Sequence, residues 1–468
     1  MIAAISPAPR TATPDPGRIR FPNPNPNPSP KPNRHSIRFS KLGLPLWKPK
    51  LNWLSYERVQ PMQMAWVRSM SGGCFKSTEP PPKQGIKVEE DSGGQDVYDA
   101  DAMNSRVSPE HLVIMVNGLI GSAADWRYAA EQFVKKLPDK VIVHRSECNY
   151  LKLTFDGVDL MGERLAQEVL AVVKRRPEVQ KISFVAHSLG GLVARYAIGR
   201  LYEHSSKLDP LVLYGNSSTE KHTNSSLQYF EQPCEDRIAG LEPMNFITFA
   251  TPHLGSRGHK QLPLLCGLPF LEKRASQTAH LVAGRSGKHL FLTDNDDGKP
   301  PLLLRMVDDS DDLKFISALR AFKRRVAYAN ANYDHMVGWR TSSIRRQNEL
   351  PKSNLLVIDE KYPHVVYVER ETTNKIQNKA FFVAGAQTSD VEEVMIQGLT
   401  QVPWERVDVS FQKSKQRYVA HNTIQASNLV SENELIGHVL GPSLLVKSYW
   451  LNSDGADVVF HMIDNFLL

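Results

Sequence analysis

Residues 184–191, FVAHSLGG, place a serine at the point where a predicted buried strand meets a predicted helix. The stretch KISFVAHS is an apolar run typical of a buried strand, and GGLVARYAIGRLYEH then has apolar residues at helical spacing. A small residue, any residue, Ser, any residue and Gly coincide by chance roughly 0.3 times in a chain of this length. The motif alone therefore does not make Ser188 a nucleophile, and its setting has to be examined.

Strands and helices alternate along the chain on both sides of this motif. Apolar strand-like runs and amphipathic helical segments follow one another at residues 111–117, 122–137, 140–146, 157–176, 181–188 and 243–252. Such alternation predicts an α/β protein with a mostly parallel sheet and helices on both faces. A serine in a sharp strand-to-helix turn of such a sheet is the nucleophile elbow of the α/β-hydrolase fold, which we therefore predict.

The positions around Ser188 suit such an elbow. The turn is strained and neighbouring backbone approaches it closely, so small residues are needed two positions before and two after the serine. Ala186 and Gly190 stand at these positions. The N-terminus of the helix that begins beneath Ser188 also favours negative charge developing there.

A second stretch, VNGLIGSAADW at residues 116–126, follows the first strong strand. Hydrolases of this fold place there the loop that supplies one oxyanion-hole N–H group, and the residue after the nucleophile supplies the other. We therefore expect the backbone amides of Leu119 and Leu189 to hold an oxyanion, with Gly118 allowing a tight bend. An ordinary Asn-Gly turn is the alternative interpretation.

A serine nucleophile needs an acid and then a histidine further along the chain. RRVAYANANYD alternates like a strand and ends in Asp334, which puts a carboxylate at the carboxyl edge of the sheet. The acidic cluster MVDDSDD at residues 306–312 is the rival, but it precedes this strand and is typical of a solvated loop. We predict Asp334 as the acid.

Five histidines, from His335 to His461, follow or adjoin the predicted acid. His421, in YVAHNTIQ, follows the strand-like WERVDVSF by a short charged loop and is the predicted base. His461 falls on the polar face of an amphipathic helix, which predicts a surface residue paired with acids. His253, in ATPHLG, precedes the acid and so breaks the required order; we expect it to shape the loop over the site.

Five stretches of residues 111 to about 340 resemble a family of serine esterases known as domain of unknown function 676. They are VNGLIGSAADW, TFDGVDLMGERLAQEV, FVAHSLGGLVARYAIG, FITFATPHLG and YDHMVGWRTSSIR. The resemblance implies a lipase-like α/β-hydrolase, with Asp334 at the family's acid position, and AHNTI at His421 is similar to the family's histidine signature. It implies a serine acyl hydrolase acting on lipid or other carboxylic esters, without metal or organic cofactor.

The chain departs from the family pattern directly after the predicted base. About twenty residues, 426–445, intervene between HNTIQ and VKSYWLNSDGADVVFHMIDNF. An insertion this close to His421 could loosen the loop that positions the imidazole. Two alternatives therefore stay open: a catalytically impaired hydrolase fold that binds a small molecule or partner, and an acyltransferase with the same triad.

Residues 1–105 differ in composition from the rest. They are rich in Pro, Gly and charge, and residues 1–56 contain nine Lys or Arg against a single acid, Asp15, so that this part carries most of the net charge of +7. We expect a disordered region. Its first part resembles an organelle transit peptide, which would place the protein in a chloroplast; a plain disordered tail, or translation starting at Met70, is the alternative.

Residues 106–468 are the expected catalytic domain. Within it, irregular polar stretches at 205–242 and 254–318 predict lid-like insertions. The four cysteines form no CxxC pair, which favours reduced thiols in an intracellular protein and no metal site. The longest apolar run, 262–271, is too short to span a bilayer, and no nucleic-acid motif is present. The expected partner is a lipid or ester substrate, with peripheral membrane contact.

Overall fold

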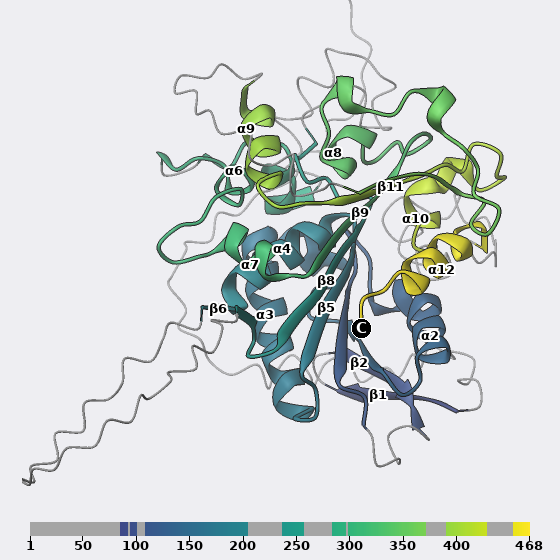
Figure 1. The fold of residues 1–468 in the computed structure, drawn as a ribbon. Coiled ribbons are helices and arrows are strands. Elements are labelled where there is room, and N and C mark those ends of the chain that lie inside the picture. The colour runs from purple at the N-terminus through teal and green to yellow at the C-terminus, as the bar shows by residue number, and fades with distance from the viewer. Residues whose placement is uncertain are drawn as a thin grey trace, which may run out of the picture. The chain divides into compact units, whose positions relative to one another are not determined.

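A nine-stranded sheet forms the centre of the molecule in the computed structural model (Figure 1). The structure describes residues 85–91, 94–100, 108–204, 236–256, 283–295, 298–370, 390–427 and 453–468. The sheet order is β1-β2-β4-β3-β5-β8-β9-β11-β10. The strands are β1 (Ile86–Asp91), β2 (Gly94–Asp99), β3 (His111–Val116), β4 (Val141–Ser146), β5 (Lys181–His187), β8 (Glu242–Phe249), β9 (Arg324–Asn330), β10 (Val365–Arg370) and β11 (Glu405–Val409).

The six central strands β4, β3, β5, β8, β9 and β11 run parallel to their neighbours. Antiparallel pairs occur toward the two edges, where β2 pairs with β4 and with β1, and β10 pairs with β11. The chain goes from β3 to β4 on one side and returns to β5 on the other side. It then proceeds outward through β8 and β9 to the edge strand β10, and β11 comes back between β9 and β10. This is the strand order of the α/β-hydrolase fold, and it makes a switch point at the carboxyl ends of β3 and β5, where ligands bind in open α/β sheets.

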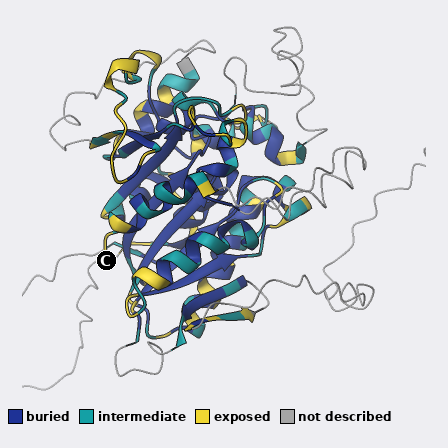
Figure 2. Ribbon diagram, turned by 90° about the vertical axis from the view of Figure 1, so that its right-hand side faces the viewer, coloured by how far each residue is buried: buried dark blue, intermediate teal, exposed yellow. Residues whose placement is uncertain are grey.

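The side chains of β3 divide between two cores, one on each face of the sheet. Leu112, Ile114 and Val116 belong to one cluster, and Val113 and Met115 to the other. This is the period-two alternation expected of a strand that is buried on both sides. The central strands of the sheet are accordingly buried, whereas the edge strands β1 and β10 and the outer faces of the helices are partly exposed (Figure 2).

Helices cover both faces of the sheet, as predicted. α3 (Val158–Arg175), α4 (Leu189–Leu201) and α7 (Phe315–Ala321) contribute to the first core. α2 (Arg127–Lys136) and α12 (Ala456–Asp464) contribute to the second and lie on the opposite side (Figure 1). α9 (Asp390–Leu399) packs near α6 (Leu302–Arg305). No helix in the described part of the chain is both long and apolar enough to cross a membrane.

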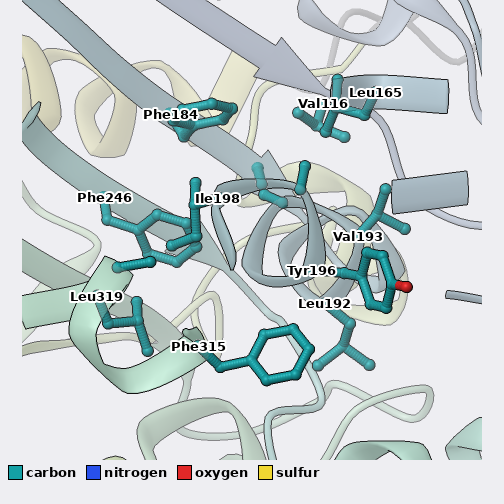
Figure 3. Close-up of a cluster of buried hydrophobic side chains, with 14 of the residues drawn as sticks. Val116, Leu165, Phe184, Leu192, Val193, Tyr196, Ile198, Phe246, Phe315 and Leu319 are labelled. Carbon is teal, nitrogen blue, oxygen red and sulfur yellow. The ribbon is translucent and has the colours of Figure 1, made fainter. Parts of the chain in front are cut away.

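α4 is the most deeply buried of these helices because it is packed on several sides (Figure 3). Its residues Leu192, Val193 and Ile198 lie among side chains from β3, α3, β5, β8 and α7. Helix and strand close on each other where α4 begins, since a Cβ added at Gly191 would lie 2.1 Å from the Thr251 hydroxyl oxygen. The helix that follows Ser188 is therefore held rigidly against the sheet.

The prediction of disorder through residue 105 is wrong for residues 85–91 and 94–100, which form the β1–β2 hairpin. The stretch EEDSGGQD is a hairpin signal, because a Ser-Gly pair separates two strand-like segments. Val97 and Tyr98 are buried, which fastens the hairpin to the domain. Residues 1–84 lie outside the described part of the chain, and the predicted transit peptide falls there.

A buried charge cluster joins this hairpin to β4 and α3. His144 lies between two carboxylates, with Nδ1 2.6 Å from Asp96 Oδ1 and Nε2 3.2 Å from Glu168 Oε1. Arg175 and Arg176 donate to Asp96 from the other side. Burial alone would lower the pKa of His144, but the hydrogen bonds to Asp96 and Glu168 raise it to about 9. The imidazole is therefore a cation that pairs two otherwise repelling carboxylates.

We expect the free energy of unfolding to fall as the pH rises through about 9. The folded-state pKa of His144 is raised, so its contribution is complete below the unfolded value of about 6.5 and is lost as the pH passes the folded value. Urea unfolding at about pH 7 and about pH 10 measures the difference, which we expect to be about 2 kcal/mol. His144→Gln is the control, because it has no proton to lose. Equal pH dependence of the two proteins would contradict the assignment.

The prediction of a lid-like insertion at 254–318 is wrong for much of its described part. Leu302 and Leu303 of α6, and Phe315 and Leu319 of α7, are buried in the first core. A further helix, 283–290, carries side chains that accept hydrogen bonds from the backbone at the start of α3. The polar stretch TDNDDGKPP led to the prediction of an irregular insertion, although helical segments with buried side chains lie on both sides of it.

The insertion predicted at 205–242 ends in a short strand, β7 (Arg237–Ile238), which pairs with β6 (Tyr202–Glu203). Residues 205–235 and 257–282 of the two predicted insertions lie outside the described part of the chain. The same holds for residues 428–445 of the insertion predicted after His421. A lid role for residues 205–235 and 257–282 stays a prediction.

Candidate active site

Ser188 stands in a strained turn between β5 and α4. Its backbone has φ 52° and ψ −127°, in a region that residues with a side chain rarely adopt. The Ser188 amide donates to the Phe249 carbonyl (2.8 Å), and the Ser188 carbonyl accepts from the Gly191 amide (3.1 Å). The turn is therefore fixed from both sides, and its strain agrees with the predicted elbow.

The small residues of the elbow are explained by close backbone approach. A Cβ added at Gly190 would lie 2.4 Å from the Asn117 carbonyl oxygen, which no real contact allows. Ala186 is fully buried in β5 and lies opposite Val116 of β3. Both positions are thus crowded by the end of β3.

His421 joins Ser188 to Asp334. Its Nε2 lies 2.9 Å from Ser188 Oγ, and its Nδ1 lies 3.0 Å from Asp334 Oδ2. A carboxylate only accepts hydrogen bonds, so Nδ1 carries the proton and Nε2 is left as the acceptor for the serine hydroxyl. Ser188 directly follows β5, Asp334 lies four residues after the end of β9, and His421 lies in the short helix α10 (Ala420–Thr423). The structure brings the three side chains together as a general base needs.

Asp334 accepts hydrogen bonds that keep it ionised. Oδ1 accepts from the backbone amides of Met336 (3.0 Å) and Val337 (2.8 Å), and Oδ2 accepts from Asn330 Nδ2 (2.9 Å) as well as from His421. Burial alone would raise the pKa of Asp334, but His421 and these donors lower it below its ordinary value. The carboxylate is therefore able to orient and stabilise a cationic His421.

The rival acidic cluster at 306–312 has a structural role. Asp309 Oδ1 accepts from the backbone amides of Ile316 (2.8 Å) and Ser317 (3.1 Å) at the start of α7. This is a helix-capping arrangement, which accounts for the acidic residue without any catalytic role.

The loop after β3 lies against the serine. A Cβ added at Gly118 would be 2.9 Å from Ser188 Cβ, so a larger residue would obstruct the elbow. The loop is fixed by hydrogen bonds from the Ile120 amide to Thr154 Oγ1 (2.9 Å) and from the Leu151 amide to the Gly121 carbonyl (3.2 Å). The structure therefore gives Gly118 a close-approach role, whereas the sequence analysis expected it to allow a tight bend.

The two amides predicted to form the oxyanion hole lie next to this contact. Leu119 follows Gly118, and Leu189 is the first residue of α4, where backbone amides lack partners inside the helix. Neither amide donates to another group within the described residues. Their use for an oxyanion stays a prediction.

His253 is completely buried beneath the loop that follows β8. Its Nε2 lies 3.0 Å from Thr248 Oγ1, and its ring packs edge-on against Trp404. Its carbonyl accepts from Arg195, whose side chain is also buried. Burial and the charge of Arg195 lower the pKa of His253 well below its ordinary value. The ring makes no hydrogen bond with Ser188 or His421, so its place is that of a support for the loop.

The prediction that His461 is a surface residue is wrong. Only 7% of it is exposed, and Nδ1 lies 2.8 Å from the Tyr328 hydroxyl. Burial lowers its pKa, which favours the neutral ring. Helix α12 packs against both α2 and the edge strand β10, and His461 on its more polar face lies against the rings of Tyr328 and Tyr362. Helical periodicity cannot show such coverage from two sides.

Two further residues touch the site, and the sequence analysis did not select them. His187 Nε2 lies 2.7 Å from the His421 carbonyl oxygen. Asn330 Nδ2 lies 2.9 Å from Asp334 Oδ2 and 3.2 Å from the Ala420 carbonyl oxygen. Both are the last residues of central strands. His187 adjoins Ser188 in the sequence and Asn330 is four residues before Asp334, and this closeness was the sequence signal that could have found them.

The described chain on either side of residues 428–452 lies beside α10. The described chain stops at Ser427 and resumes at Ser453, and a Cβ added at Gly455 would lie 1.7 Å from the Thr423 carbonyl oxygen. The Asp454 amide donates to the Gln416 side chain (3.3 Å). The returning chain is therefore packed directly against the helix that carries His421.

The fold and the Ser188–His421–Asp334 arrangement define a protein of the α/β-hydrolase class. The family model described as "Putative serine esterase (DUF676)" matches residues 106–344, and the chain belongs to this family. The resemblance predicted from the sequence is confirmed.

Curated relatives carry lipase names. "Putative lipase ROG1" of Saccharomyces cerevisiae is 31% identical over 240 residues, which cover 50% of this chain and 28% of the relative. A protein of Schizosaccharomyces pombe, also named a putative lipase, is 28% identical over 244 residues, which cover 50% of this chain and 26% of the relative. The matched region thus spans little more than a quarter of these relatives.

Solved structures with some similarity include the lipase BlEst2 of Bacillus licheniformis in its mature form. It has 15% sequence identity and a TM-score of 0.27, over 49% of this chain and 68% of the other. Carboxyl esterase 2 of Tuber melanosporum has 12% identity and a TM-score of 0.30, over 55% and 70% of the two chains.

Proposed function

We propose that this protein is a serine acyl hydrolase that cleaves carboxylic esters with apolar acyl groups, including lipid esters. The observation that carries the proposal is the hydrogen-bonded series from Ser188 through His421 to Asp334, at 2.9 Å and 3.0 Å. It starts at a strained elbow, and membership of a serine esterase family supports the same chemistry.

The reaction has two halves, in which His421 carries the proton. Ser188 Oγ attacks the ester carbonyl carbon while its proton moves to His421 Nε2, and the amides of Leu119 and Leu189 stabilise the oxyanion. The intermediate collapses to an acyl-serine, and His421 returns the proton to the departing alcohol. Water then attacks the acyl group while His421 takes its proton, and Ser188 regains it as the carboxylate product leaves.

The surroundings of the site favour an apolar substrate. Four large apolar side chains are exposed within three residues of a proposed site residue in the chain: Ile120 (39%), Met336 (49%), Tyr418 (65%) and Val419 (38%). They flank Leu119, Asp334 and His421 in the chain. Exposed apolar side chains this close in the chain to the site residues favour an acyl chain or a lipid surface as the partner.

A fluorophosphonate probe tests the proposed nucleophile. We expect wild type to be labelled covalently at Ser188 and Ser188→Ala not to be labelled, because only an activated serine reacts with the probe. Ser183→Ala is the matched control, since this buried serine of β5 is remote from His421 and should leave labelling intact. Absence of labelling in wild type, or labelling that survives Ser188→Ala, would contradict the proposal.

The acyl preference is tested with p-nitrophenyl esters of increasing chain length and with phospholipid vesicles. We expect kcat/KM to rise from acetate to longer chains, because each buried methylene contributes about 0.8 kcal/mol. A preference for acetate would contradict an apolar acyl site. Transfer of the acyl group to an added alcohol in preference to water would indicate an acyltransferase instead.

A further inference from the structure

We propose that His187 and Asn330 are positioning residues that hold the base His421 by its backbone, through two consecutive carbonyl groups. This inference rests on the proposed function, since it concerns how the proposed base is placed. Asp334 fixes the rotation of the imidazole, whereas these two side chains would fix the position of the backbone from which the imidazole extends.

His187 provides the first of the two contacts. It is the last residue of β5, is 4% exposed, and lies next to Ser188 in the chain. Its Nε2 is 2.7 Å from the His421 carbonyl oxygen, which can only accept, so Nε2 carries the hydrogen. Burial and the neighbouring His421 lower the pKa of His187 to about 3, so the ring is a neutral donor. The strand end that presents the nucleophile thus also holds the base.

Asn330 provides the second contact from the end of β9. One of its two amide hydrogens is directed at Asp334 Oδ2 and the other at the Ala420 carbonyl oxygen, at 2.9 Å and 3.2 Å. Both partners only accept, so the amide nitrogen, and not the oxygen, must face them. Asn330 is 1% exposed and serves the acid and the base segment at once.

The base segment needs this support because it has little helix of its own. α10 consists of the four residues Ala420–Thr423, and such a single turn is not stable by itself. The two strand ends belong to the sheet that also presents Ser188, so nucleophile, acid and base share one rigid frame. A shift of about 1 Å in such a site can lower the rate about 100-fold.

Two substitutions of His187 distinguish a hydrogen bond that positions His421 from simple packing of the side chain. We expect His187→Leu, which fills the site without a donor, to lower kcat roughly 10- to 100-fold with KM within about 2-fold. His187→Gln supplies an amide donor of similar reach and should recover kcat to within about 3-fold of wild type. Equal losses in the two variants, or unchanged kcat in His187→Leu, would overturn the proposal.

His111→Leu is the matched control. His111 is also a buried histidine, and its Nε2 lies 2.8 Å from Ser183 Oγ. It is the first residue of β3 and so lies at the amino ends of the parallel strands, whereas Ser188 lies at their carboxyl ends. We expect it to lower stability and to leave kcat unchanged. A loss of kcat equal to that of His187→Leu would mean that any such change disturbs catalysis, and would overturn the specific role.

Asn330 is tested in the same way with Asn330→Leu and Asn330→Asp. The aspartate has the same shape but directs an acceptor at Asp334 and at the Ala420 carbonyl, so we expect it to lower kcat more than leucine does. A smaller loss for Asn330→Asp than for Asn330→Leu would overturn the role of the donor.

A measurement without turnover distinguishes failure of this proposal from failure of the proposed function. The Nδ1 proton of His421, bonded to Asp334, should give a low-field proton NMR signal in wild type and His187→Gln. We expect the signal to shift or broaden in His187→Leu and Asn330→Leu, even if no ester is hydrolysed. An unchanged signal in both leucine variants would overturn the positioning role.

Discussion

Asp334→Asn is expected to lower kcat by about 10⁴-fold while the protein remains folded. In the wild-type protein the Asp334 carboxylate accepts a hydrogen bond from His421 Nδ1 and so leaves Nε2 free to take the serine proton. An amide that turns its nitrogen toward Nδ1 would favour the other tautomer, in which Nε2 carries a hydrogen and cannot act as a base. The neutral side chain would also fail to stabilise the imidazolium that forms when Ser188 attacks.

The fold should tolerate this change, because the amide oxygen can still accept from the backbone amides of Met336 and Val337. Steady-state hydrolysis of a p-nitrophenyl ester, together with thermal unfolding, measures the two effects. Asp309→Asn is the matched control from the rival acidic cluster, and we expect little change in stability and unchanged kcat, because the amide oxygen can still cap α7. Asp334→Asn activity within about 10-fold of wild type would contradict the assigned acid.

Much of the site could be predicted because its chemistry depends on chain order and strand ends. Ser188 directly follows a buried strand and Asp334 follows another by four residues, and the carboxyl ends of parallel strands meet at one edge of the sheet. Local periodicity is sufficient to find such strands. His421 followed from order along the chain, and the structure places it between the other two.

Other features depend on contacts that sequence patterns do not contain. The hairpin of β1 and β2 looked like a charged linker because its stability comes from buried pairs, such as Asp96 with His144, across 48 residues. His461 looked exposed because a helical wheel shows one apolar face and not a second covering layer. His187 and Asn330 could not be assigned roles, since their partners are backbone carbonyls 234 and 90 residues away.

Gly455→Ala is expected to lower kcat about 100-fold and to destabilise the fold by about 2 kcal/mol. The added Cβ would lie 1.7 Å from the Thr423 carbonyl oxygen, less than any real contact, so one of the two segments must move by more than 1 Å. Thr423 is the last residue of α10, two positions after His421. Both segments reach the second core, α12 through Val458, Val459 and Met462 and the α10 segment through Ala420 and Ile424. We expect α10 to yield, because a single helical turn has few hydrogen bonds of its own.

The measurements are ester hydrolysis and thermal unfolding of the same samples. Gly298→Ala is the matched control, because its Cβ would meet no atom within 4 Å; its φ of +71° costs stability, by about 1 kcal/mol, without reaching the site. If Gly455→Ala kept full kcat, the chain around residue 455 would have moved and α10 would not. The position of His421 would then not depend on that chain. A loss of kcat in Gly455→Ala, with kcat unchanged in Gly298→Ala, would instead show that the chain after the insertion helps to keep the base in place, whatever the length of the segment between Ser427 and Ser453.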